Sequence, residues 1–216
     1  FDLDFAPVLD VNSNPDNPII GNRAFADTPI HAAERALTFM RGLQGAGIIP
    51  CGKHFPGHGS SSGDSHLGFV NISENWQEKE LAPYKIMISR GEVDAVMTAH
   101  LVHYGLDPSG LPATLSPRMI STLLRRDLGF DGVIISDDLQ MQAIASRYKF
   151  QEAVRRAVLA GADLLIVGNN LERNPDALAQ GMAAIQELLD QGRISEERIR
   201  SSLRRIDLLL QFITRG

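Results

Sequence analysis

The sequence predicts an α/β fold built on parallel strands, a (β/α)8 barrel of the TIM type. Short apolar runs alternate with longer segments of helical periodicity, which is typical of right-handed βαβ units. Four runs have an almost continuous apolar centre, as strands buried on both faces do. The run at 47–55 is interrupted by Pro50 and gives the weakest signal. The predicted strands lie within residues 3–11, 47–55, 93–101, 131–139 and 162–170.

The helices between these strands have recognisable ends. Asp27 is suited to cap the first helix, with Pro29 in its first turn. Ser116 and Pro117 predict the start of another helix, and Ser195 predicts the cap of the last one. The predicted helices span residues 27–45, 75–91, 116–129, 150–161, 176–191 and 195–210.

Polar side chains follow every predicted strand, and this favours a barrel over an open doubly wound sheet. In a barrel the carboxyl ends of all strands face one mouth, whereas an open sheet builds its site only at the switch point. No G-x-G-x-x-G sequence follows any strand, so a dinucleotide-binding fold has no support. The polar residues concerned are Asp10, Asn12, Lys53, His54, His100, Asp137, Asp138, Asn169 and Asn170.

The number of units is smaller than a whole barrel requires. We count five βα units, whereas a barrel has eight in roughly 250 residues. The chain also opens on Phe1, inside a strand-like run. We therefore expect residues 1–216 to form a single domain that is the C-terminal portion of a barrel and lacks its N-terminal βα units. The alternative is a partial barrel closed by another copy of the chain.

Composition limits the class of protein. The 216 residues are 44% hydrophobic and 22% charged, which is ordinary for a globular domain. The net charge of −5 and the lack of a basic cluster argue against nucleic acid as a partner. No apolar stretch of about 18 residues suggests a membrane span. Cys51 is the only cysteine, so no internal disulfide forms; this fits the cytoplasm, although a disulfide-free secreted protein would fit too.

One glycine- and serine-rich segment, residues 51–66, concentrates groups able to do chemistry: Lys53, His54, His58, Asp64 and His66. Proline and glycine between the first two histidines exclude a helical zinc motif, so metal binding is a minority hypothesis. The segment lacks the spacing of a phosphate-binding loop. A purely solvated loop remains an alternative, but an acid/base device is more economical. A carboxylate beside an imidazole fixes its tautomer and raises its pKa, as Asp64 and His66 would do.

The second chemical candidate is the pair Asp137 and Asp138, at the end of the predicted strand 131–139. Adjacent side chains on a strand point to opposite sides, so only one of these carboxylates faces a ligand. The other is suited to cap the turn that follows.

Several separated blocks resemble the β-N-acetylglucosaminidases of glycoside hydrolase family 3, of the cell-wall recycling type. They are K-H-F-P-G-H-G followed by D-S-H, and residues 5–25, 96–100, 112–117 and 123–139. The resemblance implies that Asp137 is the nucleophile and Asp138 its structural neighbour. It implies that His66 is the general acid and base, oriented by Asp64. Arg23, Lys53 and His54 match residues that hold the N-acetylglucosamine ring, and His58 supports the loop.

The implied reaction is a retaining double displacement on terminal β-linked N-acetylglucosamine, with no cofactor and no metal. The expected substrates are peptidoglycan fragments or chitooligosaccharides, and hydrolysis and phosphorolysis both stay open. The alternatives are a non-catalytic or incomplete sugar-binding barrel and a family 3 β-glucosidase or xylosidase. We also expect residues 57–65 to be mobile.

Overall fold

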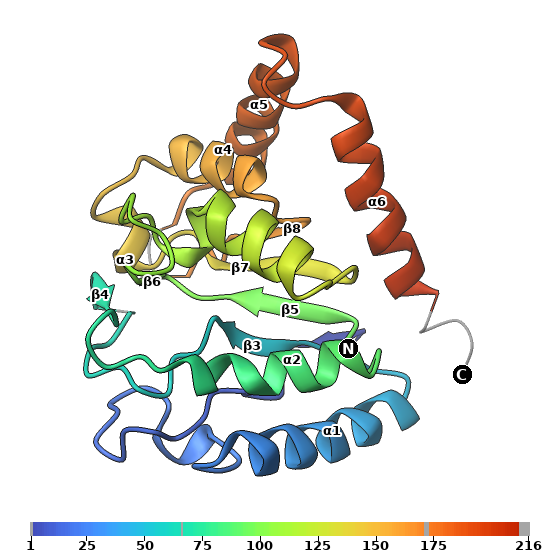
Figure 1. Cartoon of the computed structure of the whole chain (residues 1–216). Coiled ribbons are helices and arrows are strands. Elements are labelled where there is room, and N and C mark those ends of the chain that lie inside the picture. The colour runs from blue at the N-terminus through green and yellow to red at the C-terminus, as the bar shows by residue number, and fades with distance from the viewer. Residues whose placement is uncertain (1, 66, 171–172, 212–216) are drawn as a thin grey trace.

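A row of parallel strands organises the computed structural model, which describes residues 2–65, 67–170 and 173–211 (Figure 1). The strands β3 (Gly52–Phe55), β5 (Ala95–Thr98), β7 (Val133–Asp138) and β8 (Leu164–Ile166) form a sheet in that order. Next to β3, the strand β1 (Leu3–Asp4) pairs with β2 (Ile49–Pro50), and a bridge joins Val8 to Lys53. All these pairings are parallel.

The order of the strands in space follows their order in the chain. A doubly wound sheet reverses its strand order at a switch point, whereas barrel strands succeed one another in one direction. The described strands therefore form an arc of the barrel type, and the predicted α/β fold with parallel strands is confirmed. The interruption at Pro50 is also visible, because the predicted strand 47–55 is split into β2 and β3.

Helices connect successive strands of the arc (Figure 1). Helix α1 (Pro29–Gly45) leads to β2, η2 (Glu78–Leu81) and α2 (Ala82–Ser89) lead to β5, and η4 (Arg118–Asp127) leads to β7. Beyond β7 come α3 (Gln142–Ala145) and α4 (Phe150–Ala160), and beyond β8 come α5 (Ala177–Asp190) and α6 (Glu196–Leu210). Short elements complete the chain: η1 (Gly21–Arg23), β4 (Val70–Asn71), β6 (Leu101–Val102) and η3 (Ala113–Leu115). No helix in the described part of the chain is long and apolar enough to cross a membrane.

The strands bury apolar side chains on both faces, as their continuous apolar runs predicted. On β5 and β7, Val96 and Ile134 pack with the side chains of α1, α2 and η4. The alternate residues Ala95, Met97 and Ile135 belong to a separate cluster on the other face, which includes Leu209 of α6. Burial on both faces fixes the register of each strand, and hence which residues stand at its carboxyl end.

The helix ends agree with the sequence signals in part. Ser195 caps α6, because its hydroxyl accepts a hydrogen bond from the backbone N–H of Arg198 at 3.1 Å. The prediction that Asp27 caps α1 is wrong. The residue at the cap position is Thr28, with Pro29 at the start of the helix, and its side chain makes no capping hydrogen bond.

Candidate active site

A cavity of about 240 Å³ lies at the carboxyl ends of β3, β5, β7 and β8. Four predicted site residues line it: Arg23, Lys53, His54 and Asp137. Asp64 is not among the lining residues, and His66 lies outside the described residues, as does the geometry of the predicted acid/base pair. The remaining lining residues are Phe5, Ile19, His58, Ser65, Met97, Asp138 and Ile166.

The buried carboxylate of Asp10 organises the side of the cavity at β3. It accepts hydrogen bonds from the backbone N–H of His54 at 3.2 Å and of His58 at 2.8 Å, and from Nδ1 of His54 at 2.8 Å. Burial alone would raise the pKa of Asp10, but the two histidines outweigh it and the pKa lies below its usual range. Since Nδ1 of His54 is committed to Asp10, its Nε2 is the nitrogen left for a ligand in the cavity.

His58 supports the loop from within. Its Nδ1 lies 2.7 Å from the hydroxyl of Ser61, and its Nε2 lies 3.2 Å from the hydroxyl of Ser65. Burial lowers the pKa of His58, so the ring is neutral near pH 7 and accepts at one nitrogen while donating at the other. This geometry agrees with the supporting role expected for His58.

The first half of the loop, residues 57–61, is anchored to the body of the protein. Asn17 donates to the carbonyl oxygens of His58 at 2.7 Å and Gly59 at 3.0 Å. The buried carboxylate of Glu80 accepts from the backbone N–H groups of Gly59 at 3.1 Å and Ser60 at 3.3 Å. These contacts contradict the expectation that all of residues 57–65 move freely, because residues 57–61 are buried and hydrogen-bonded.

The glycines of the loop permit this close packing. A Cβ atom on Gly59 would lie 1.7 Å from the carbonyl oxygen of Val11. Gly57 has φ of +118°, and a Cβ there would lie 2.7 Å from the Cβ of Glu80. Any larger residue at either position would push the loop away from the strand exits.

Asp137 and Asp138 differ as the strand alternation predicted. One carboxylate oxygen of Asp138 accepts from the backbone N–H groups of Gln140 and Gly168, both at 3.0 Å. Within the described part of the chain, Asp137 accepts only from the backbone N–H of Asp138, at 2.8 Å. Asp138 therefore holds the turn, and Asp137 presents a largely unpaired carboxylate to the cavity.

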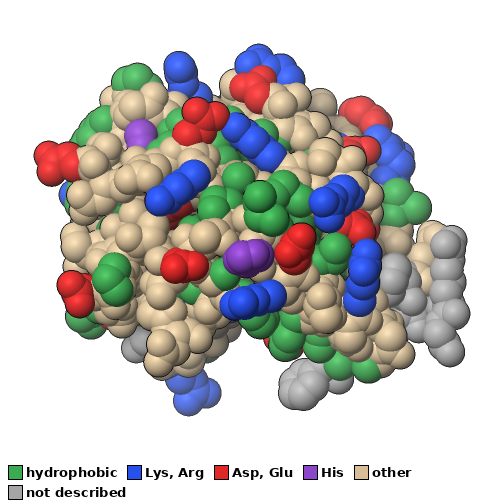
Figure 2. Space-filling model, turned by 60° about the horizontal axis from the view of Figure 1, so that its bottom comes forward, with side chains coloured by type: hydrophobic (Ala, Val, Ile, Leu, Met, Phe, Trp, Pro, Cys, Tyr) green, Lys and Arg blue, Asp and Glu red, His purple; other side chains and the backbone are tan. Residues whose placement is uncertain are grey.

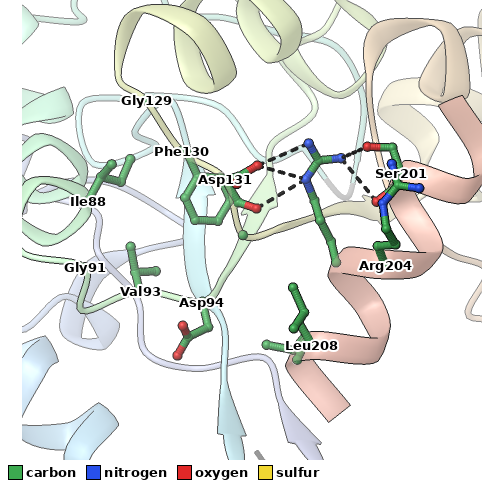
Figure 3. A pocket seen from close by; sticks show the side chains of 13 residues that line it. Ile88, Gly91, Val93, Asp94, Gly129, Phe130, Asp131, Ser201, Arg204 and Leu208 are labelled. Carbon is green, nitrogen blue, oxygen red and sulfur yellow. Dashed lines mark hydrogen bonds and ion pairs between the residues drawn. The ribbon is translucent and has the colours of Figure 1, made fainter. Parts of the chain in front are cut away.

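A larger cavity, of about 540 Å³, lies at the opposite, amino ends of β5 and β7 (Figure 3). Apolar side chains such as Ile88, Phe130 and Leu208 line it, together with charged residues. Arg205 donates to Asp131 at 3.2 Å and to the hydroxyl of Ser201 at 3.1 Å, as the dashed lines in Figure 3 show. None of the predicted site residues lies there, so we place the site in the smaller cavity.

The structure bears on two predictions from the sequence, the low weight given to a metal site and the lack of a basic cluster. Among residues 2–65, 67–170 and 173–211, no group of three or more His, Cys, Asp or Glu side chains is arranged to hold a metal ion. On the face drawn in Figure 2, the coloured basic and acidic side chains are interspersed, and that face shows no continuous basic patch.

The sequence did not predict the structural roles of three residues near the site, Asp10, Glu80 and His100. Asp10 and His100 were recognised only as polar residues at strand ends. Glu80 lies in the predicted helix 75–91, and nothing in its spacing connects it with Ser60, 20 residues earlier. Only the folded path of the chain brings Glu80 and the loop together.

Comparisons with known proteins give a consistent result. The sequence model described as the glycosyl hydrolase family 3 N-terminal domain matches residues 1–209. The structure of a glycoside hydrolase family 3 β-N-acetylglucosaminidase from Paenibacillus superposes with a TM-score of 0.91 at 41% identity, covering 99% of this chain and 40% of that one.

Curated relatives agree. A β-hexosaminidase from Neisseria meningitidis serogroup C is 43% identical over 171 residues, which are 78% of this chain and 46% of that protein. A β-hexosaminidase from Tolumonas auensis is 40% identical over 172 residues, 78% of this chain and 50% of that protein. The chain spans about half the length of these relatives. The matched segment, the parallel α/β arc and the site at its carboxyl ends together show that this chain belongs to glycosyl hydrolase family 3.

Proposed function

We propose that the protein is a retaining, exo-acting β-N-acetylglucosaminidase. The observation that carries the proposal is the cavity at the strand exits, which Asp137 enters with a largely unpaired carboxylate opposite Lys53 and His54. The names of the relatives, β-hexosaminidase and β-N-acetylglucosaminidase, support the same activity. Residues that hold a neutral sugar and one nucleophilic carboxylate suit glycoside cleavage without a cofactor.

In the proposed first step, a carboxylate oxygen of Asp137 attacks the anomeric carbon of the terminal sugar. The glycosidic bond breaks, and His66 transfers its proton to the leaving oxygen, so that a glycosyl ester of Asp137 forms. In the second step, water attacks the same carbon, its proton goes to His66, and Asp137 leaves as a carboxylate. Attack from opposite faces in the two steps retains the β configuration.

The proposed roles of the other residues follow their positions. Asp64 orients His66 and favours its protonated form. Lys53, His54 and Arg23 hold the ring hydroxyls and the acetamido group, since all three line the cavity. Asp10 keeps His54 in one orientation through the 2.8 Å contact at Nδ1. The proposed substrates are saccharides ending in β-linked N-acetylglucosamine, from peptidoglycan or chitin.

The test is hydrolysis of an aryl N-acetyl-β-glucosaminide by the purified protein and by two variants, Asp137→Ala and His66→Ala. Loss of the nucleophile is expected to lower kcat/KM by on the order of 10³-fold or more. Azide in place of the lost carboxylate should restore turnover of Asp137→Ala and yield the α-glycosyl azide, since attack comes from one face only. Asp131→Asn is the control, because this aspartate is exposed at the opposite end of the strands.

Undiminished activity in both variants would exclude the proposal. Tight binding of N-acetylglucosamine without any turnover by the unaltered protein would favour the alternative, a non-catalytic sugar-binding domain. Faster turnover of aryl β-glucosides or xylosides would favour the other family 3 activities. Loss of activity after removal of divalent metals would support the metal hypothesis instead.

A further inference from the structure

We propose that His100 is a positioning residue that holds Asp137 in the orientation for attack; this rests on the proposed function. His100 is buried at the exit of β5, and its ring spans to the neighbouring strand β7. Its Nε2 lies 2.8 Å from the backbone carbonyl oxygen of Asp138, the residue after the nucleophile. Its Nδ1 lies 3.0 Å from the hydroxyl of Thr114.

The partners of His100 determine which nitrogen carries the proton. A carbonyl oxygen only accepts hydrogen bonds, so Nε2 of His100 must donate to Asp138. Burial lowers the pKa of His100, and the ring is therefore neutral near pH 7 with a lone pair at Nδ1. The hydroxyl of Thr114 lies 3.0 Å from this lone pair and 3.0 Å from the carbonyl oxygen of Ala99, so the two acceptors share its single proton. The hydroxyl of Thr98 on β5 lies 2.9 Å from the same hydroxyl oxygen of Thr114.

The carbonyl that His100 grips belongs to a residue held at several points. The same oxygen also accepts from the backbone N–H of Met141 at 3.0 Å. The carboxylate of Asp138 is held by the N–H groups of Gln140 and Gly168. With carbonyl and side chain fixed, the orientation of the residue is determined, and its own N–H points at the carboxylate of Asp137, at 2.8 Å.

A chain of hydrogen bonds thus runs from Thr114 through His100 and Asp138 to the attacking group. Within the described residues, the N–H of Asp138 is the one donor to Asp137, so its direction sets the direction of the carboxylate. Without His100, the carbonyl of Asp138 keeps only Met141 as a donor, and the turn has more freedom. A displacement of about 1 Å at a reacting atom can cost on the order of 10²-fold in rate.

His103 provides a matched control. It is also buried and lies three residues further along the chain. Its ring packs edge-on against Trp76, with centroids 4.8 Å apart, and its Nδ1 accepts from the N–H of Leu106 at 3.0 Å. These contacts have no connection with β7. Replacing His103 therefore tests the loss of a buried histidine without disturbing Asp138.

The experiment compares His100→Leu, His100→Gln, His100→Asn and His103→Gln in the purified protein. The amide nitrogen of glutamine reaches about as far as Nε2 of histidine, whereas that of asparagine reaches only as far as Nδ1. We expect kcat/KM to fall about 10²-fold in His100→Leu and His100→Asn, and to return to within about 10-fold of the unaltered protein in His100→Gln. His103→Gln should stay within about 2-fold.

Two further readouts separate positioning from general damage. The dissociation constant of N-acetylglucosamine, measured by calorimetry, should change by less than about 3-fold in every variant, because ground-state contacts of the sugar are untouched. The rate loss in His100→Leu should also be equal for substrates with good and poor leaving groups, because proton donation is not affected. A loss confined to poor leaving groups would assign His100 to the acid/base step and overturn the inference.

The remaining outcomes are equally decisive. Full activity in His100→Leu overturns the inference, as does an asparagine variant faster than the glutamine variant. If His100→Leu does not fold, the order of the Gln and Asn variants still decides the question. Asp137→Asn in the same series separates the two proposals. If that variant is active, the proposed function fails; if it is inactive while His100→Asn is fully active, only the positioning role fails.

Discussion

The carboxylates at the two ends of the strands β5, β7 and β8 differ in how many donors surround them. At the amino end, the side chain of Asp163 is fully buried and surrounded by donors. Arg125 donates to it at 2.5 Å, Ser202 at 2.5 Å and the N–H of Ile134 at 2.9 Å, with Arg198 and Arg205 at 3.6 and 3.7 Å. At the carboxyl end, Asp137 receives one backbone hydrogen bond from the residues that the structure describes, and it lines a cavity.

The difference shows which end of the strands stabilises the fold and which end presents a reactive side chain. A buried carboxylate with every oxygen paired holds elements together and reacts with nothing. Burial even lowers the pKa of Arg125 to about 10, which measures how far this network is withdrawn from water. A carboxylate with one donor costs more to fold but is available to an electrophile. In barrels the carboxyl end carries the active site and the amino end carries stability.

Cavity size alone would have selected the wrong end. The cavity at the amino end is the larger, at about 540 Å³ against about 240 Å³. Within it Arg205 pairs with Asp131, whereas the smaller cavity holds Lys53 and His54 of β3 and Asp137 of β7 at the carboxyl ends of the strands. The position of reactive side chains at strand exits is thus a better guide to the site than the volume of a cavity.

The largest expected effect on stability comes from breaking the network at the amino end. Asp163→Ala leaves Arg125 buried without its carboxylate, and we expect the free energy of unfolding to fall by about 3–5 kcal/mol. Chemical denaturation measures this. The activity of the molecules that remain folded should be unchanged, because Asp163 lies away from the cavity that Asp137 lines.

The control for Asp163 is Asp131→Asn, which removes an exposed partner of Arg205 and should cost less than about 1 kcal/mol. The contrast between the two ends breaks down if Asp163→Ala folds normally but hydrolyses substrate slowly.

A smaller effect is expected from the loop at the carboxyl end. In Gly59→Ala the new methyl group meets the carbonyl oxygen of Val11, so the backbone must shift, at a cost of about 1–3 kcal/mol. The shift displaces residues 57–61, and we expect kcat/KM to fall by about 10-fold or more. Thermal melting and hydrolysis of the aryl glycoside measure the two effects.

Gly68→Ala is the matched control for Gly59→Ala. It lies in the same loop, but a Cβ there meets nothing within 4 Å. Its stability should change by less than about 0.5 kcal/mol. Equal effects of the two substitutions would contradict the idea that close packing positions the loop.

Much of the fold follows from local pattern, and part of the site does too. The apolar runs predicted five strands in the correct places, and side-chain alternation separated Asp137 from Asp138. Ser195 could be assigned as a cap because capping depends on residues three positions apart. The assignment of Asp27 as the cap of α1 failed because the neighbouring residue, Thr28, is of a type that also occupies cap positions, and where the first turn begins depends on the packing of α1.

The remaining part of the site depends on contacts between distant residues. Asp10 meets His54 and His58 across more than 40 positions, and Glu80 meets Ser60 across 20. No periodicity reports such a pairing, because it depends on the path of the loop in space. The expectation of mobility failed for residues 57–61 for this reason, because glycine and serine content indicates freedom while hydrogen bonds with Glu80 and Asn17 remove it.

The smallest effect concerns the pH dependence of stability at Glu80. Burial raises its pKa above the usual 4.5, although hydrogen bonds from Ser60 act in the opposite direction. Because the folded protein binds this proton more tightly than the unfolded chain does, the stabilising contribution is fully present below about pH 4.5. It is lost as the pH rises through the folded pKa. Glu80→Gln has no proton to lose, so its stability relative to the unaltered protein should improve as the pH rises towards neutrality.

Urea denaturation across this pH range measures the effect, and Glu78→Gln tests its sign. Glu78 is exposed, and its hydrogen bond with Lys85 lowers its pKa. Its contribution is therefore present above pH 4.5 and is lost as the pH falls, so the relative stability of Glu78→Gln should change in the opposite direction. Parallel curves for Glu80→Gln and the unaltered protein would mean that the carboxylate at the loop carries no ionisation cost. If the relative stabilities of Glu80→Gln and Glu78→Gln change in opposite directions with pH, the carboxylate of Glu80 is a buried charge that destabilises the folded protein at neutral pH. The same carboxylate accepts the hydrogen bonds that hold residues 57–61 beside the site.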